Sequence, residues 1–212
     1  MSKNNGFTLV EILIALFIFA ILAVITTVGL HSAINTKQRV EKIDQKLSEL
    51  QIAQTLLRRD ALQAVDRKVI DEDGHFAPAF IMTGSGAMRF TRDGQVNPLG
   101  AAQRSNLQRV GYVFRDGELV RLTWVALDRL PETKVEKKVL LKGVTLISMR
   151  VLDVNNRAYK LWPPSEGSNL DMNRFQVAMP KAIKLNFKVK NLGEIIDFFP
   201  IPSRSVSHDD SN

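Results

Sequence analysis

The chain shows three successive patterns of apolar and polar positions. Residues 7–30 are apolar almost without a break, and residues 31–70 carry apolar side chains at every third or fourth position. From about residue 76, short alternating runs are separated by turn residues. A long apolar run is typical of a membrane-spanning helix, a spacing of three to four of an amphipathic helix, and alternation of half-buried strands. The pattern therefore predicts a transmembrane helix, a helical spine and a β-rich head.

The first apolar run is long enough to cross a bilayer. As a helix, residues 7–30 would extend over roughly 36 Å, and the hydrocarbon core of a bilayer is about 30 Å thick. The small-residue cleavage site that ends a secretory signal peptide does not follow, because Val24-Ile25-Thr26-Thr27 continues toward a polar helix. Residues 7–30 are therefore predicted to be a transmembrane helix.

The helix is predicted to continue through residues 31–70 with one apolar stripe. Gln54 interrupts this stripe, and Ile52, Leu56 and Leu62 widen it beyond the seam of a coiled coil, so packing against the protein's own sheet is favoured. Asp71-Glu72-Asp73-Gly74 and then Pro78 predict where the helix ends. The stripe consists of Val40, Ile43, Leu47, Leu50, Leu57, Ala61 and Ala64.

Residues 71–202 are predicted to form the β-rich head. The clearest hairpin joins residues 110–114 to residues 119–126, and its two-residue loop Asp116-Gly117 is typical of a type I′ turn. That turn would place Arg115 opposite Glu118. Further strands are predicted at residues 139–141, 144–152 and 183–190 and from Gly193 through Phe198, whereas the polar residues 203–212 are predicted to be a disordered tail.

Basic residues give the chain a formal net charge of +7, which raises the question of nucleic acid. Lys181, Lys184, Lys188 and Lys190 fall on the outward face of an alternating strand, where lysine commonly protects a sheet edge. No aromatic residues are interleaved with them to stack on bases. Nucleic acid is therefore not an expected partner.

Candidate catalytic groups are sparse. The sequence gives His31, His75 and His208 no evident serine, aspartate or metal partner, and the absence of cysteine excludes disulfides and a thiol nucleophile. The acidic run at residues 71–74 lacks the glycine and glutamate spacing of an EF-hand and is interpreted as a solvated helix end. We therefore expect no enzyme, no catalytic residue, no cofactor and no metal site.

Glu11 is the single charge inside the apolar run. A carboxylate in the middle of a membrane helix costs about 2.5–3.5 kcal/mol, so it calls for a partner. Cleavage between Gly6 and Phe7 would create an amino terminus at the i, i+4 spacing from Glu11, either in the same helix or in a neighbouring one. The alternative is an ordinary anchor whose Glu11 reaches the interface.

The residues Gly6-Phe7-Thr8-Leu9-Val10-Glu11, followed by the apolar run, resemble the class III signal of type IV pilins and type II secretion pseudopilins. The resemblance implies that residues 1–6 are a leader that a prepilin peptidase removes on the cytoplasmic side. It also implies that the peptidase methylates Phe7, and that Glu11 guides the docking of subunits. Lys3 and the α-amine favour a cytoplasmic leader.

The head shows a narrower resemblance, to the J-type minor pseudopilins of type II secretion systems. The order and spacing of several short motifs carry it. They are Arg59-Asp60-Ala61-Leu62-Gln63, Phe90-Thr91-Arg92, Asn97-Pro98, residues 107–112, Trp124, Leu127-Asp128-Arg129, Pro131, residues 140–144, Trp162-Pro163, residues 179–183 and Gly193-Glu194-Ile195.

This resemblance implies a pilin-like α+β fold, in which a long N-terminal helix, its first half transmembrane, packs on an antiparallel head of two sheets. The implied partners are I-type and K-type minor pseudopilins, the major pseudopilin, the prepilin peptidase and inner-membrane lipid. The implied role is to initiate, at the pseudopilus tip, assembly of the filament that exports folded proteins across the outer membrane. The helix would pass once through the bacterial inner membrane, with a periplasmic head. A minor pilin of a type IV pilus or competence system is the alternative.

Overall fold

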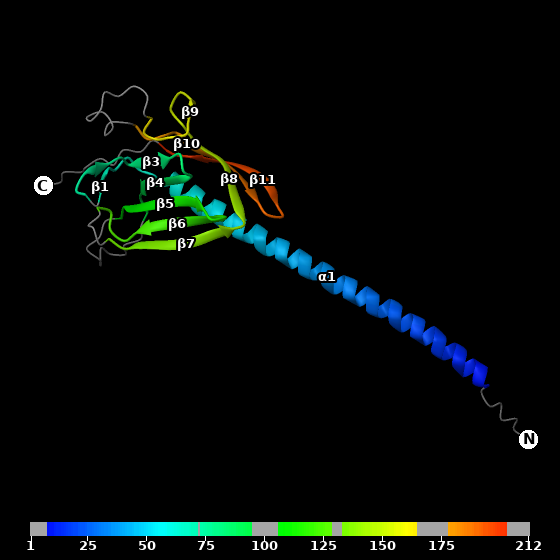
Figure 1. Cartoon of the computed structure of the whole chain (residues 1–212). Helices are drawn as coiled ribbons and strands as arrows, with labels where there is room; N and C mark the ends of the chain where they lie inside the picture. Colours follow the sequence, from blue (N-terminus) through cyan, green and yellow to red (C-terminus); the bar gives the residue numbers. More distant parts are fainter. Residues whose placement is uncertain (1–7, 72, 95–105, 129–132, 165–177, 203–212) are drawn as a thin grey trace, which may run out of the picture. The chain divides into compact units, whose positions relative to one another are not determined.

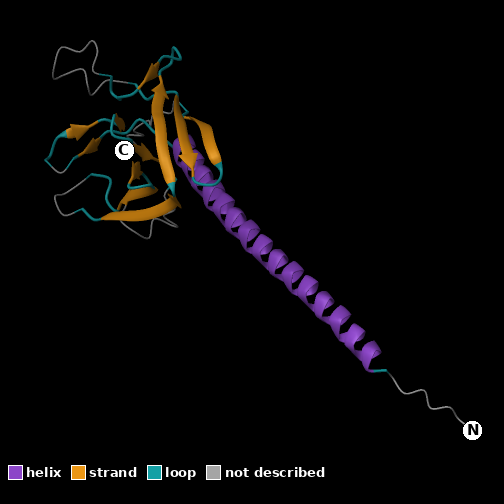
Figure 2. Cartoon of the chain, turned by 45° about the vertical axis from the view of Figure 1, so that its right-hand side comes forward, coloured by secondary structure: helices purple, strands orange, loops and turns teal. Residues whose placement is uncertain are grey.

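One long helix and a series of strands make up the protein. The computed structural model describes residues 8–71, 73–94, 106–128, 133–164 and 178–202. Helix α1 (Leu9–Leu62) is followed by strands β1 to β11, all of them paired antiparallel (Figures 1 and 2). The chain divides into two compact units, Met1–Lys46 and Leu47–Asn212. The predicted α+β class is confirmed.

Helix α1 ends at Leu62, so the predicted continuation to residue 70 is wrong. Beyond Leu62 the backbone bonds to a strand: the amide of Val65 donates to the carbonyl of Thr91 at 3.0 Å, and the carbonyl of Gln63 accepts from Asp93 at 2.8 Å. These sheet-like bonds replace the helical ones. Tertiary pairing therefore overrides the local helical pattern, and Asp71 and Asp73 of the acidic run lie between β1 (Val69–Ile70) and β2 (Phe76–Ala77).

A five-stranded meander forms one sheet of the head. Its strands follow chain order as β3 (Phe80–Thr83), β4 (Ala87–Arg92), β5 (Gln108–Arg115), β6 (Glu118–Trp124) and β7 (Val135–Lys142). Asp116 and Gly117 have φ angles of 53° and 74°, as a type I′ turn requires. Arg115 lies opposite Glu118, so the predicted turn and register are confirmed.

A four-stranded sheet follows, with the order β11-β10-β8-β9. The strands are β8 (Val144–Leu152), β9 (Ala158–Tyr159), β10 (Ala182–Val189) and β11 (Gly193–Pro200). Gly143, with φ 67°, links β7 in the first sheet to β8 in the second. The two-sheet head is therefore confirmed, and the small β1-β2 pair is additional to it.

The basic strand β10 lies in the interior of its sheet and not at an edge, because β11 and β8 flank it. Its alternation is as predicted: Ile183, Leu185 and Phe187 are buried, whereas Lys184 and Lys188 are exposed. The interpretation of these lysines as edge protection is therefore wrong. Lys188 lies opposite Glu194 of β11, which gives one of the charges a neighbour of opposite sign.

The last turns of α1 belong to the core of the second unit. Leu50, Leu57 and Ala61 are buried, as the apolar stripe predicted, whereas Leu47 of the stripe is exposed. Ala53, which was not part of the predicted stripe, is also buried, and Ile52 is exposed. The amide of Gln54, which interrupts the stripe, donates to the carboxylate of Asp197 on β11 at 2.8 and 3.1 Å. The helix shares one buried cluster with both sheets, which includes Phe80, Met82, Phe90, Tyr112, Leu141, Ile183, Leu185 and Phe199.

Candidate assembly site

A capping box closes the N-terminal end of α1. The carboxylate of Glu11 accepts hydrogen bonds from the amide and the hydroxyl of Thr8, both at 2.9 Å, and the amide of Glu11 donates to the Thr8 hydroxyl at 3.3 Å. This reciprocal pair satisfies backbone donors that a helix start leaves free. The sequence signal for it, threonine followed three residues later by glutamate, was available but was not used.

Glu11 has a local partner before any other subunit is considered. Thr8 supplies two donors to the carboxylate, which lowers the cost of holding this acid among apolar side chains. The predicted cleavage pair, Gly6 and Phe7, lies outside the described residues, so its geometry relative to Glu11 stays a prediction.

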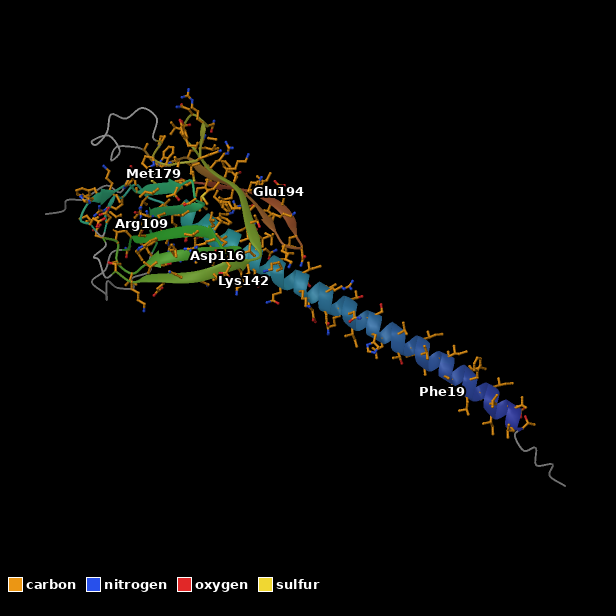
Figure 3. The ribbon with its side chains drawn as sticks, viewed as in Figure 1. Phe19, Arg109, Asp116, Lys142, Met179 and Glu194 are labelled. Atoms are coloured by element: carbon orange, nitrogen blue, oxygen red, sulfur yellow. The ribbon has the colours of Figure 1, made fainter. Side chains whose placement is uncertain are left out.

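The apolar half of α1 is exposed along its whole length. Its most apolar 18-residue window has a mean hydropathy of 2.9, and none of that window is buried. Figure 3 shows side chains radiating from the helix around Phe19. The hydroxyl groups of Thr26 and Thr27 donate hydrogen bonds to the backbone carbonyl oxygens of Leu22 and Ala23, at 2.8 and 2.7 Å. Because these polar groups are satisfied within the helix, the segment suits a membrane.

A buried charge cluster fixes the last turns of α1 to the five-stranded sheet. Asp60 of α1 is fully buried. One carboxylate oxygen accepts hydrogen bonds from the hydroxyl of Tyr112 on β5 and from Nε of Arg121 on β6, both at 2.7 Å. The other oxygen lies 3.3 Å from a guanidinium nitrogen of Arg92 on β4. One carboxylate thus holds three neighbouring strands.

The cluster places two nearly buried guanidinium groups beside one acid. The guanidinium group of Arg92 donates hydrogen bonds to the side-chain oxygens of Gln63 at 2.6 Å and Gln108 at 3.0 Å. These bonds satisfy part of its N–H donors. Burial lowers the pKa of Arg92. Burial also opposes the charge on Arg121, but the hydrogen bond and the negative charge of Asp60 outweigh it, so the pKa of Arg121 is raised. Without Asp60, both cations would be buried without a counter-charge.

Tyr112 makes the stability of the head depend on pH in the alkaline range. Burial, and then the charge of Asp60, raise the pKa of Tyr112 well above its usual 10. The folded protein therefore keeps a proton that the unfolded chain releases above about pH 10. Tyr112 contributes fully to stability below that pH, and the contribution is lost as the pH rises further.

We expect the free energy of unfolding to fall above about pH 10 by up to about 1.4 kcal/mol per pH unit on account of Tyr112. Tyr112→Phe should remove this part of the slope, since phenylalanine has no proton to release. Urea unfolding at pH 9 to 11 would measure it, with Tyr159→Phe as the control. An unchanged slope in Tyr112→Phe would show that Tyr112 does not retain its proton.

The turn between β1 and β2 brings His75 close to two acids, which the sequence analysis did not expect. Potential ligand atoms of Asp71, Asp73 and His75 lie within 4.8 Å of one another. Asp73 and His75 are exposed, and one oxygen of Asp71 already accepts the backbone amides of Asp73 and His75, at 3.1 and 2.8 Å. The loop's own hydrogen bonds therefore account for the cluster.

Comparison with known proteins gives consistent matches for both parts of the chain. The family model for type II secretion system (T2SS), protein J, matches residues 28–201, and the model for the prokaryotic N-terminal methylation motif matches residues 1–27. Over 148 residues the chain is 36% identical to type II secretion system protein J of Escherichia coli, covering 66% of this chain and 74% of that protein.

Two further matches cover more of the length. Type II secretion system protein J of Klebsiella pneumoniae is 27% identical over 201 residues, which are 94% of this chain and 96% of that protein. A chain in the crystal structure of the GspK-GspI-GspJ complex from enterotoxigenic Escherichia coli superimposes with a TM-score of 0.62 at 27% identity. The superposition covers 75% of this chain and 99% of that chain.

Proposed function

This chain belongs to the family of type II secretion system protein J, and from that premise we propose that it helps to initiate the pseudopilus as part of its tip. Members of this family are minor pseudopilins, so this chain is one as well. The observation that carries the assignment is the family match over residues 28–201, which includes the described head up to Ile201. The role of the family is structural, so we infer that this chain catalyses no reaction of its own.

The partners that we propose are an I-type and a K-type minor pseudopilin. A related chain forms a GspK-GspI-GspJ complex, which supports this choice. The major pseudopilin would dock after the tip has formed. The head is locked to the last turns of α1 by buried Leu50 and Leu57 and by the Asp60 cluster, so a subunit that binds those turns also holds the head.

In the proposed processing, removal of the leader creates a new amino terminus that acts in docking. A prepilin peptidase would cleave between Gly6 and Phe7 and methylate Phe7, and the methylation motif over residues 1–27 supports this. The new amino terminus would lie one helical turn from Glu11. In the assembled tip, the terminus of a neighbouring helix can then share the Glu11 carboxylate with Thr8. Docking thereby lowers the free-energy cost of holding the Glu11 carboxylate in lipid. This gain favours the assembled state over the separate subunits.

The proposed orientation follows from the leader and the apolar run. Lys3 and the α-amine would keep the leader in the cytoplasm, α1 would cross the inner membrane once, and the head would lie in the periplasm. Within the part of the chain that the structure describes, one helix, α1, is long and apolar enough to cross a membrane, which supports such an anchor.

Deletion of the gene tests this function. We expect export of folded proteins across the outer membrane to stop, while transport into the periplasm continues, and expression of the chain to restore export. The restored protein should lack residues 1–6 and carry one added methyl group by mass spectrometry. Normal export together with loss of type IV pili or of DNA uptake would instead identify a minor pilin.

A further inference from the structure

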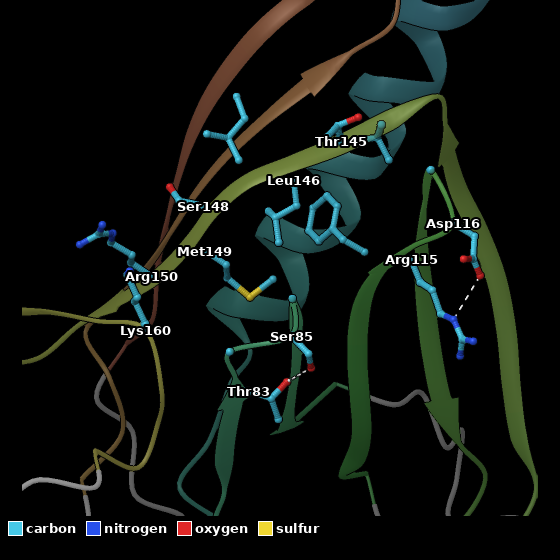
Figure 4. A pocket seen from close by; sticks show the side chains of 16 residues that line it. Thr83, Ser85, Arg115, Asp116, Thr145, Leu146, Ser148, Met149, Arg150 and Lys160 are labelled. Atoms are coloured by element: carbon cyan, nitrogen blue, oxygen red, sulfur yellow. Dashed lines mark hydrogen bonds and ion pairs between the residues drawn. The ribbon is translucent and has the colours of Figure 1, made fainter.

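An open pocket of about 650 Å³ lies between the two sheets of the head (Figure 4). The β3–β4 turn and the β5–β6 turn form one side of it, and β8 forms the other. The larger apolar residues of the lining are Phe114, Val144, Leu146, Ile147 and Met149. The pocket is therefore bordered along one side by a strand, which is the feature that decides what fits it.

Strand β8 has an open edge in this pocket. On one side it pairs with β10 along its whole length, but on the other side β9 pairs only with Val151 and Leu152. Among the described residues, no strand covers residues 145–150 on that side. All six of these residues line the pocket. The pocket thus contains an unpaired strand edge about 20 Å long at 3.3 Å per residue.

The hydrogen bonds at the two ends of β8 show which backbone groups face the pocket. The amide of Val144 donates to the carbonyl of Gly117 on the pocket side at 3.0 Å, and the carbonyl of Leu152 accepts from Lys181 on the β10 side at 2.7 Å. Backbone groups of alternate residues point to opposite neighbours. A bulge opposite Asn186 and Phe187 shifts the alternation once. Leu146 and Met149 therefore direct their backbone groups toward the pocket.

The charges around the pocket are mainly positive. Arg150 and Lys160 lie at one end, and Arg115 lies at the other beside Asp116 (Figure 4). Asp116 is the acid in the lining, and it pairs with Arg115 at 3.1 Å in an exposed position. Three cations against one acid favour an occupant with carboxylates.

We propose that this groove binds an extended, acidic segment of a partner protein, which adds to the open edge of β8 as a further strand. Main-chain hydrogen bonds to Leu146 and Met149 hold the segment, and the apolar floor takes alternate side chains. Arg150 and Lys160 select for carboxylates. The inference does not depend on the proposed role at the tip, because it requires only the groove within the head.

A binding experiment with the full-length chain in detergent micelles tests the proposal. The probe is a fluorescent peptide of about ten residues in which glutamate alternates with valine or threonine. Fluorescence anisotropy should show saturable binding. A peptide with lysine in place of glutamate should not bind, and neither should the acidic peptide with N-methylated amides, because strand addition needs those donors.

Matched variants locate the binding site. The double variant Arg150→Glu and Lys160→Glu should weaken binding about tenfold, since two exposed ion pairs of up to about 1 kcal/mol each are lost. Lys137→Glu and Lys138→Glu, two exposed residues of β7 that do not line the pocket, should leave it unchanged. Equal binding of the N-methylated peptide, or no effect of the first pair, would overturn the proposal. Truncation after residue 202 that raises affinity tenfold would also overturn it, since the occupant would then be the chain's own tail.

Discussion

Replacement of Asp60 by asparagine is expected to destabilise the head by about 3–5 kcal/mol, the range for removing one partner of a buried ion pair. Asparagine keeps the size of the side chain but removes the charge that balances Arg92 and Arg121. Both guanidinium groups would then stay buried without an anion. Urea unfolding of a version that begins at residue 31 would measure the loss.

Asp128 provides the matched control for this prediction. Its carboxylate lies 3.9 Å from a guanidinium nitrogen of Arg67, and the side chains of both residues are more than 40% exposed. The carboxylate also accepts the backbone amide of Ile70 at 2.9 Å, a hydrogen bond that the side-chain oxygen of asparagine can accept in its place. Asp128→Asn should therefore cost less than about 1 kcal/mol. A loss of similar size in Asp60→Asn would mean that the cluster does not fix α1 to the sheet.

Replacement of Glu11 by alanine is expected to leave the head folded and to weaken recruitment into the tip complex by up to about a hundredfold. The upper limit is the cost of an unpaired acid in a membrane helix, about 2.5–3.5 kcal/mol, because the hydrogen bonds from Thr8 already offset part of that cost before docking. The yield of the tip complex extracted from membranes, relative to wild type, measures the effect. Equal yield would remove Glu11 from the docking mechanism.

Two further variants separate docking from capping. Thr8→Val removes the hydroxyl that bonds to Glu11 but keeps the carboxylate, so it should retain most of the yield. Glu41→Ala removes an exposed acid on the same helix that pairs only weakly with Lys37 at 3.7 Å, and it should have no effect. If Thr8→Val were as defective as Glu11→Ala, the carboxylate would act through the start of the helix.

Local signals in the sequence predicted the elements that depend on few residues. Asp116-Gly117 predicted both the turn and the register of the β5–β6 hairpin, because positive φ angles at two successive positions leave little choice. The alternation of apolar and polar residues in β10 predicted its buried face, because successive side chains of a strand point to opposite faces of the sheet. The β3–β4 hairpin, with Gly84-Ser85-Gly86 between two apolar runs, carried a signal of the same kind that was not used.

Features that depend on distant residues could not be predicted in this way. The end of α1 is set by bonds from residues 63–65 to the end of β4, and no local pattern announces them. The Asp60 cluster joins a helix to three strands, so the sequence alone could not show that this acid is buried. The interior position of β10 depends on sheet order, which alternation does not encode.

The proposed role requires this chain to assemble with an I-type and a K-type minor pseudopilin. The most direct test mixes a version that begins at residue 31 with the I-type and K-type heads of the same organism and measures the masses by light scattering after gel filtration. We predict a species whose mass is that of all three proteins together. A chain that stays monomeric with both heads but binds a minor pilin of a type IV pilus or competence system would contradict the claim.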